Sequence, residues 1–403
     1  MSDARFVSKN IASKMLAIVA ALGFQFTMIE LAPAQALSTL YTFTGGKDGA
    51  NPTAGLAWSN GYLYGTTAYT VFGLTTTGEE IMLTELPSYS FPNDPPIVGG
   101  HTYFEGLGQE FYLTAEGNGC GAILLATNTG YAFPLYSFTG ESDGCMPMGR
   151  LVRAGAGAFY GTASGGGSSN AGTIFKIAKA GPYLQYRFSL LYTFTGEADG
   201  GVPDGTLILD KQGNLYGTTS SGGAYGFGTV FEFNSAGETV LYSFKGGSDG
   251  ANPTGDLLLD SKGNFYGTTS GGGIFGLGTV YELSASGAET ILHNFAGGSD
   301  GASPAAGVIK DGNEILYGTT VYGGTEAVCN QYQPLNGCGI VFEIFPNGVA
   351  AVLHDFTGGA DGGEPFGKLT RDQQGNLYGT TSQGGDLESC PELGCGVVFK
   401  IAP

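Results

Sequence analysis

The chain contains 403 residues, including 73 glycines, 26 phenylalanines and 22 tyrosines, and only 13% of its residues are charged. Short apolar runs separated by glycine exclude a mainly helical chain and a disordered one, and they are typical of an all-β protein. The formal net charge of −19 disfavours binding to nucleic acid or to anionic membranes. It is compatible with cations, with basic partners and with simple solubility.

The first 36 residues have the pattern of a secretory signal peptide. A basic start is followed by an apolar run over residues 15–29 and by the small residues of APAQA, which predict cleavage after Ala36. An uncleaved membrane anchor is the alternative, but the apolar run is short for a bilayer span and ends at Glu30. We therefore expect residues 37–403 to form a secreted protein, extracellular or periplasmic according to the host, with no membrane span after cleavage.

The rest of the sequence is an internal repeat. The tripeptide Tyr-Gly-Thr begins at Tyr64, Tyr160, Tyr216, Tyr266, Tyr317 and Tyr378, and a degenerate copy contains Tyr112. The spacing of 48 to 61 residues between copies is typical of β-propeller blades. A β-helix would have a much shorter repeat, and a β-sandwich would not repeat its sequence.

The clearest unit, residues 255–301, predicts four antiparallel strands. Its segments GDLLLD, NFYGTT, TVYEL and ETILHNF are separated by turns and loops rich in Ser and Gly. The chain begins with a segment of the fourth-strand type (39–43) and ends with one of the third-strand type (394–403). We therefore predict an all-β, seven-bladed β-propeller over residues 37–403, whose last blade is completed by the N-terminal strand. The second blade, about 92–138, is the most degenerate copy.

The strand order of such a blade places two kinds of connection on one side of the ring. These are the glycine-rich loops between the second and third strands and the links from each blade to the next, and we name this side the loop face. Turns such as DSKGN lie on the opposite side, which we name the turn face.

Six cysteines are typical of a protein from an oxidising compartment. We predict the disulfides Cys120–Cys145, Cys329–Cys338 and Cys390–Cys395. The last two close short loops, and the first joins two cysteines that both fall on the loop face. Spacing alone allows fifteen pairings. A zinc site is a further alternative, but no histidine is near these cysteines and no Cys-x-x-Cys motif occurs.

The repeat has the form G-x-L-x-x-D-x-x-G-N-L-Y-G-T-T-x-x-G-G, followed by G-T-V-F-E. It is clearest at residues 205–233, 255–283 and 367–385. This pattern resembles the GloVer tandem repeat of bacterial exported proteins over nearly all of residues 38–403. The resemblance implies a propeller-like exported protein, and it supplies no catalytic residues.

The links carry the most regular polar residues. One aspartate precedes glycine in each of six links: Asp48, Asp143, Asp199, Asp249, Asp300 and Asp361. In the structural interpretation, each carboxylate accepts backbone N–H groups and stabilises a tight turn. In the functional interpretation, these carboxylates bind a ligand, either by holding calcium with loop carbonyl groups or by making the loop face electronegative. One acid in each loop is few for calcium, which takes about 6–8 oxygen ligands, and no other cofactor is predicted.

Tyrosines occur in two settings. Tyr225, Tyr322 and Tyr332 lie in glycine loops and are candidates for stacking on a sugar or for contact with a protein partner. The tyrosine of each Tyr-Gly-Thr copy is interpreted as structural: it packs between blades, the glycine admits a neighbouring backbone, and the threonine suits a strand.

The sequence assigns no catalytic residue. Three G-x-S-x-G matches lack a constant serine in sister repeats and have no following helix. His293 and His354 replace the tyrosine of an LYSF-like strand, and His101 has no evident partner. We therefore predict a secreted, monomeric binding or scaffold module whose loop face contacts a carbohydrate or protein partner. A hydrolase or lyase on the same scaffold is the alternative.

Overall fold

The computed structural model describes residues 36–59, 61–86, 103–105, 110–115, 119–127, 131–155, 157–181, 185–325, 329 and 335–403. They belong to the compact unit Ala36–Pro403. The predicted signal peptide, His101 and Tyr332 lie outside the described residues. Within the described part, no helix is long and apolar enough to cross a membrane.

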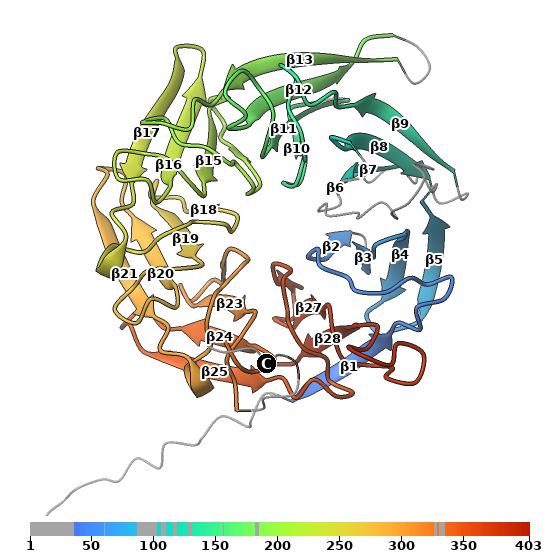
Figure 1. Ribbon diagram of the computed structural model, residues 1–403. Coiled ribbons are helices and arrows are strands. Elements are labelled where there is room, and N and C mark those ends of the chain that lie inside the picture. Colours follow the sequence, from blue (N-terminus) through green and yellow to red (C-terminus); the bar gives the residue numbers. More distant parts are fainter. Residues whose placement is uncertain are drawn as a thin grey trace, which may run out of the picture. The chain divides into compact units, whose positions relative to one another are not determined.

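Seven four-stranded antiparallel sheets form a ring, as predicted (Figure 1). Blade 1 contains β2 (Ala57–Ser59), β3 (Tyr62–Thr66), β4 (Thr70–Thr75) and β5 (Glu80–Glu85). Blade 2 contains β6 (Tyr103–Glu105), β7 (Glu110–Ala115), β8 (Ala122–Thr127) and β9 (Ala132–Ser137). Blade 3 contains β10 (Val152–Arg153), β11 (Ala158–Ala163), β12 (Thr173–Lys179) and β13 (Tyr186–Thr193).

The remaining blades repeat this order from the inside of the ring outwards. Blade 4 contains β14 (Ile208–Leu209), β15 (Leu215–Thr219), β16 (Thr229–Asn234) and β17 (Gly237–Ser243). Blade 5 contains β18 (Leu258–Leu259), β19 (Phe265–Thr269), β20 (Thr279–Leu283) and β21 (Glu289–Asn294). Blade 6 contains β22 (Ile309–Lys310), β23 (Leu316–Thr320), β24 (Ile340–Ile344) and β25 (Ala350–Asp355). Two short 3₁₀ helices, η1 (Gly247–Asp249) and η2 (Gly298–Asp300), lie in links.

Blade 7 joins the two ends of the chain, which confirms the predicted closure. It contains β26 (Thr370–Arg371), β27 (Leu377–Thr381), β28 (Val397–Ile401) and, as its outer strand, β1 (Leu37–Thr42). Leu37 pairs with Ile401 and Thr42 pairs with Val397. Figure 1 shows the blue β1 beside the red β28. Because non-consecutive strands complete this sheet, the ring has no open seam.

The hydrophobic core lies between neighbouring blades. One cluster, for example, lies between blades 7 and 1. It joins Phe43, which follows β1, and Tyr378 of blade 7 to residues of blade 1. These are Leu56, Leu63 and Phe72, and all five side chains are at most 2% exposed. The tyrosines of the Tyr-Gly-Thr copies pack across these interfaces as predicted. The ring centroid of Tyr216 in blade 4, for instance, lies 4.9 Å from that of Phe265 in blade 5.

The role predicted for the glycine of Tyr-Gly-Thr was wrong in one respect. This glycine faces an aromatic ring of the third strand rather than a neighbouring backbone. A Cβ added at Gly217 would lie 2.7 Å from the Phe231 ring, and at Gly379 it would lie 2.4 Å from the Phe399 ring. The register explains this contact, because Gly217 is directly opposite Phe231.

The degenerate second blade fills the same space with different side chains. Leu113 stands at the glycine position, and Leu124 stands opposite it where other blades have an aromatic ring. Both leucines are fully or almost fully buried, at 0% and 2% exposure. A Gly–Phe pair is therefore exchanged for a Leu–Leu pair, which fills the space without overlap.

The three predicted disulfides are confirmed: Cys120–Cys145, Cys329–Cys338 and Cys390–Cys395. Each covers a glycine of the following link, and a Cβ added at Gly45 would lie 2.9 Å from Cys390 Sγ. In blades 4 and 5, Phe227 and Leu277 cover the corresponding glycines without a covalent bond. The disulfides thus occupy a position that other blades fill with an apolar side chain.

Candidate functional site

The six link aspartates hold the ends of the outer strands. Each carboxylate accepts a hydrogen bond from a backbone N–H four residues earlier, at 2.7 to 3.0 Å. Each also contacts a tyrosine or histidine seven residues earlier, at 2.5 to 3.2 Å. These pairs are Tyr41–Asp48, Tyr136–Asp143, Tyr192–Asp199, Tyr242–Asp249, His293–Asp300 and His354–Asp361.

Internal partners therefore use most of the hydrogen-bonding capacity of these carboxylates. Burial alone would raise the pKa of Asp143, but hydrogen bonds from Thr139 and Tyr136 outweigh it and lower the pKa. His293 and His354 take the place of the tyrosine hydroxyl, which agrees with their interpretation as structural substitutions. A ligand role for the aspartates stays a prediction, and their observed contacts favour the structural interpretation.

The predicted stacking tyrosines differ in exposure. Tyr225 is 56% exposed in the glycine loop of blade 4. Tyr322 is only partly exposed, and its backbone pairs with Ala302 of the preceding link. Ile274 and Phe275 of the next glycine loop are 70% and 57% exposed, so apolar tips project from the loop face of blades 4 and 5.

A second group of residues, which the sequence analysis did not single out, converges on the axis of the ring. After each described link the chain turns inward through the motif Pro-x-Gly/Ala-z before it enters the innermost strand. The residue before the proline has a left-handed backbone at all six corners: Asn51, Met146, Val202, Asn252, Ser303 and Glu364. Its N–H bonds to a carbonyl of the preceding blade, as in Val202 to Ala171 at 2.8 Å. The backbone conformation of each corner is therefore held by its own chain, before the proline, and by a hydrogen bond to the preceding blade.

The small residue of the motif lets neighbouring corners meet backbone to backbone. A Cβ added at Gly149 would lie 2.6 Å from the carbonyl oxygen of Gly205, and one added at Gly255 would lie 2.4 Å from the nitrogen of Gly307. The ring is therefore narrow at this level. The side chains at x, together with Asp256 and Lys368 at z, line a shared cavity, which is described below.

The corners differ from one another at x and z. Position x holds Thr53, Met148, Asp204, Thr254, Ala305 and Phe366. Position z holds Gly55, Arg150, Thr206, Asp256, Gly307 and Lys368. Four ionisable side chains from blades 3, 4, 5 and 7 thus occupy positions that are neutral in other blades. The corner of blade 2 lies outside the described residues.

A cavity of about 210 Å³, which we name the axial pocket, lies among the corners. Its lining includes Thr53, Met148, Asp204, Thr254, Asp256, Phe366 and Lys368. Because x precedes z and both follow the links, the pocket lies on the loop-face side of the innermost strands. It combines polar groups with the apolar surfaces of Met148 and Phe366, as small-molecule sites commonly do.

Lys368 and Asp256 meet within the pocket. Lys368 Nζ lies 3.8 Å from Asp256 Oδ2, and the two side chains are 16% and 10% exposed. Asp256 Oδ1 accepts the N–H of Thr206 at 3.0 Å, and Thr206 Oγ1 accepts the N–H of Arg150 at 3.0 Å. Burial, together with repulsion from Arg150, lowers the pKa of Lys368 although Asp256 opposes the change.

The pKa of Asp204 shifts in the opposite direction, upwards. Burial raises its pKa to about 7, although hydrogen bonds from its own backbone, Ser220 and Gly205 oppose the change. Asp204 Oδ1 and Thr254 Oγ1 are buried and have no hydrogen-bond partner. Buried polar atoms without partners are rare, and each requires an explanation. Both residues line the axial pocket.

The polar side chains of the axial pocket do not resemble a metal centre. Among the described residues, no three or more His, Cys, Asp or Glu side chains are grouped so that they could hold a metal ion. The calcium prediction for the links stays a prediction, and the aspartate of each described link already has internal partners.

A seven-bladed β-propeller with a polar pocket on its axis is the class of protein that this fold and site define. The model of the Gloeobacter/Verrucomicrobia repeat matches residues 105–332, more than half of the chain. The chain belongs to this repeat family, which confirms the resemblance inferred from the sequence. No curated protein matches the chain in sequence at a significant level.

Solved structures share the fold at low sequence identity. A streptogramin B lyase structure superposes with a TM-score of 0.58 at 13% identity, covering 92% of this chain and 99% of the lyase. The extracellular domain of a protein described as a hybrid two-component system from B. thetaiotaomicron gives 0.55 at 10% identity, covering 92% of this chain and 41% of the other. A protein described as a 6-phosphogluconolactonase from Bacteroides uniformis gives 0.50 at 15% identity, with coverages of 81% and 97%. At these identities the similarity concerns the fold.

Proposed function

We propose that this protein is an exported carbohydrate-binding module that holds one sugar residue, or the end of a glycan, in the axial pocket. The observation that carries the proposal is the pair of unsatisfied oxygens, Asp204 Oδ1 and Thr254 Oγ1, on residues that line the pocket. Sugar hydroxyls both donate and accept hydrogen bonds, so they satisfy a carboxylate, a threonine hydroxyl and an ammonium group together. A volume of about 210 Å³ lies below the roughly 300–1,000 Å³ of sites for drug-sized ligands, which agrees with a single ring.

The apolar lining supports the same ligand class. Phe366 offers an aromatic ring and Met148 a flexible thioether on the wall of the pocket. A hydroxylated ligand with apolar C–H faces would contact both kinds of wall. Three disulfides fit an oxidising compartment, in which an exported glycan-binding protein would work.

Glycan-array screening of the purified protein, followed by calorimetric titration of the ligands found, tests this proposal. Asp204→Asn and Lys368→Met should each weaken binding by at least about tenfold and leave the fold intact. Asp386→Asn is the matched control, because Asp386 caps an exposed loop turn through the N–H groups of Glu388 and Ser389. Unchanged affinity in both pocket variants would refute axial binding.

A hydrolase or lyase is the second candidate, and one observation favours it. Lys368 has a lowered pKa and Asp204 a raised one within the same pocket, and such opposed shifts are typical of acid–base pairs. If the protein turns over glycans or lactones, the turnover should require both residues. Ligand binding without any turnover, under the same conditions, would leave the binding module as the function.

A further inference from the structure

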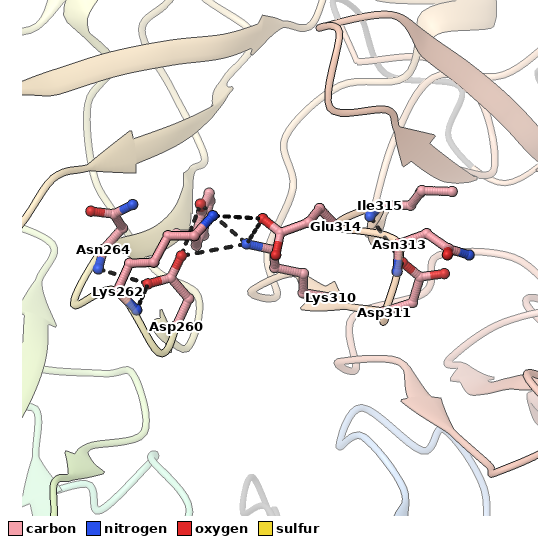
Figure 2. Close-up of polar contacts among 9 residues, drawn as sticks. Asp260, Lys262, Asn264, Lys310, Asp311, Asn313, Glu314 and Ile315 are labelled. Atoms are coloured by element: carbon pink, nitrogen blue, oxygen red, sulfur yellow. Dashed lines mark hydrogen bonds and ion pairs between the residues drawn. The ribbon is translucent and has the colours of Figure 1, made fainter.

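Acidic side chains at the junctions between blades have different partners on the turn face and on the outer rim, which the outer strands and the links form. On the turn face, Lys310 of blade 6 supplies a positive charge (Figure 2). Its Nζ lies 2.8 Å from Glu314 Oε2 and 3.4 Å from Asp260 Oδ2 of blade 5. On the outer rim, no lysine or arginine of the described residues forms an ion pair with a link aspartate. The rim therefore balances its acids in another way.

A second acid joins the link aspartate at some junctions of the outer rim. It occupies one equivalent position near the start of the outer strand, and from blade 1 to blade 7 this position holds Glu80, Ala132, Phe188, Glu238, Glu289, Ala350 and Leu37. Each glutamate follows a blade whose link aspartate bonds to a tyrosine, namely Tyr41, Tyr192 or Tyr242. Where His293 and His354 replace that tyrosine, the next blade has alanine or leucine at this position. The added acid is thus matched to a tyrosine across the junction.

At the junction of blades 3 and 4, one tyrosine proton lies between two carboxylates. Tyr192 OH donates to Asp199 Oδ2 at 3.0 Å, and Asp199 also accepts the N–H of Thr195 at 2.8 Å and its hydroxyl. Glu238 of blade 4 lies within hydrogen-bonding reach of the same tyrosine hydroxyl. Glu238 Oε1 is buried and has no hydrogen-bond partner. Because an ionised carboxylate can only accept hydrogen bonds, this junction lacks one proton unless Glu238 carries its own.

The junction of blades 4 and 5 repeats this arrangement. Tyr242 OH donates to Asp249 Oδ1 at 2.5 Å, and the N–H of Lys245 donates to Asp249 Oδ2 at 2.7 Å. Glu289 of blade 5 lies within hydrogen-bonding reach of the Asp249 carboxylate. Glu289 Oε1 is also buried without a partner. Two carboxyl groups can bond to each other only when one of them is protonated, as in other acid pairs that share one proton.

The surroundings of both glutamates favour the protonated form. The titratable groups that face them are Asp199 and Tyr192 for Glu238, and Asp249, Lys245, Tyr242 and Tyr281 for Glu289. Both side chains are half-buried. Burial and the neighbouring aspartate raise the pKa of each glutamate to about 7. Tyr192 opposes this change at Glu238, and Lys245 opposes it at Glu289, but the rise in pKa remains.

We propose that these two junctions are proton-dependent clamps, which join blades 3, 4 and 5 in a mildly acidic medium and weaken as the pH rises through neutrality. Each protonated glutamate donates a hydrogen bond from its own blade to the tyrosine or link aspartate of the blade before it. Above neutral pH the two acids of a junction repel each other. Because each pKa is higher in the folded protein than in the unfolded chain, the stabilisation is fully present below about pH 4 and is lost as the pH rises through about 7.

The clamps are separate from the axial pocket, because their groups all lie on outer strands and links. The proposal therefore does not depend on a ligand at the axis. Blade 6 offers an internal comparison, since Ala350 stands at the glutamate position beside the His293–Asp300 pair. Weakening at alkaline pH is expected at blades 3 to 5 and not at the junction of blades 5 and 6.

The first experiment records the melting temperature from pH 5 to pH 8 for the unmodified protein and for Glu238→Gln/Glu289→Gln. Glutamine is neutral and donates a hydrogen bond at every pH, so the melting temperature of this variant should fall less over the range, by about 2 °C or more. Glu232→Gln/Glu282→Gln is the matched control, because it removes two half-buried acids from the third strands of the same blades. The control should keep the fall of the unmodified protein. An equal fall in Glu238→Gln/Glu289→Gln would refute the clamps.

Hydrogen exchange in the unmodified protein locates the effect without any variant. Between pH 6 and pH 8, the protection factors of amides in β17 and β21 should decrease relative to those in β25, which begins at Ala350. An equal change in the three strands, or no change in any of them, would contradict the proposal.

Discussion

The links and the inner corners are built from the same repeat, yet they behave in opposite ways. All six described links keep an aspartate that bonds to the strand end seven residues earlier. The corners that follow hold Thr, Met, Asp, Ala or Phe at x and Gly, Arg, Thr, Asp or Lys at z. The difference teaches that constancy among repeats marks what each blade needs for its own fold. Divergence at equivalent backbone positions marks where the ring forms one shared site.

The largest expected effect concerns the glycine of Tyr-Gly-Thr, which recurs among the repeats. Gly217→Leu should destabilise the protein by about 3 kcal/mol or more, because the new side chain overlaps the Phe231 ring. The double variant Gly217→Leu/Phe231→Leu should recover much of this loss, since blade 2 uses the Leu113–Leu124 pair at the same place. Chemical denaturation measures both.

Gly312→Ala is the control for that comparison. A Cβ at Gly312 meets no atom within 4 Å, and its backbone is not left-handed. We expect a change within about 0.5 kcal/mol. A double variant no more stable than Gly217→Leu alone would contradict the proposed exchange of packing partners.

The second prediction contrasts an aspartate of a link with one of the axial pocket. Asp143→Asn should cost about 1–3 kcal/mol, because it weakens the bonds from Thr139 and Tyr136. Asp204→Asn should be neutral or stabilising, because it removes a buried carboxylate whose Oδ1 has no partner. Thermal unfolding at pH 8 distinguishes the two, and equal losses would remove the distinction between links and corners.

The pH dependence of stability should separate the same two residues. The pKa of Asp204 is raised in the folded protein to about 7. Its stabilising contribution is therefore present below the unfolded pKa near 4 and is lost as the pH rises toward 7. The pKa of Asp143 is lowered, so its contribution is present above pH 4 and is lost as the pH falls. Relative to the unmodified protein, Asp204→Asn should gain stability as the pH rises from 4 to 8. The stability lost in Asp143→Asn should stay nearly constant over that range and should shrink as the pH falls below 4.

A smaller effect concerns the strained corners. Val202 has a left-handed backbone with φ 58°, and two equivalent corners hold asparagine at 53° and 55°. Because β-branched residues are disfavoured in this conformation and asparagine tolerates it, Val202→Asn should raise stability by about 1 kcal/mol. A lower melting temperature in this variant would show that the valine side chain contributes contacts that outweigh the strain.

The smallest effect concerns the cluster of Figure 2. Glu314 has φ 66° at a turn position where sister repeats have glycine, and its ion pair with Lys310 is half exposed. Glu314→Gly removes the ion pair and the strain together, so stability should change little. Glu314→Ala removes only the ion pair and should be the less stable variant. The reverse order would contradict the strain argument.

The fold could be predicted in unusual detail because the internal repeat shows which strands and loops of the blades are equivalent. The mid-repeat start at residues 39–43 predicted the closure by β1, and matched loop positions predicted the three disulfides. The glycine of Tyr-Gly-Thr was misassigned because its neighbour, a ring on the third strand, depends on a register that the sequence does not state. Residues shared among the repeats, such as the link aspartates, have contacts that favour a structural role.

The axial pocket was missed for a related physical reason. Lys368 and Asp256 are far apart in the sequence, and each looks like a single deviation within its own blade. Only closure of the ring brings their side chains to 3.8 Å. Alignment of the copies would have shown charged residues at x and z as departures from the repeat. Even so, the burial that shifts the pKa values of Lys368 and Asp204 depends on the packed ring.

The most direct test measures glycan affinity and melting temperature together for Asp204→Asn and Asp143→Asn, with a ligand selected on the glycan array. The account predicts that Asp204→Asn loses affinity and keeps its melting temperature, whereas Asp143→Asn keeps its affinity and melts lower. The opposite pattern, with binding lost in the link variant and stability lost in the pocket variant, would contradict it.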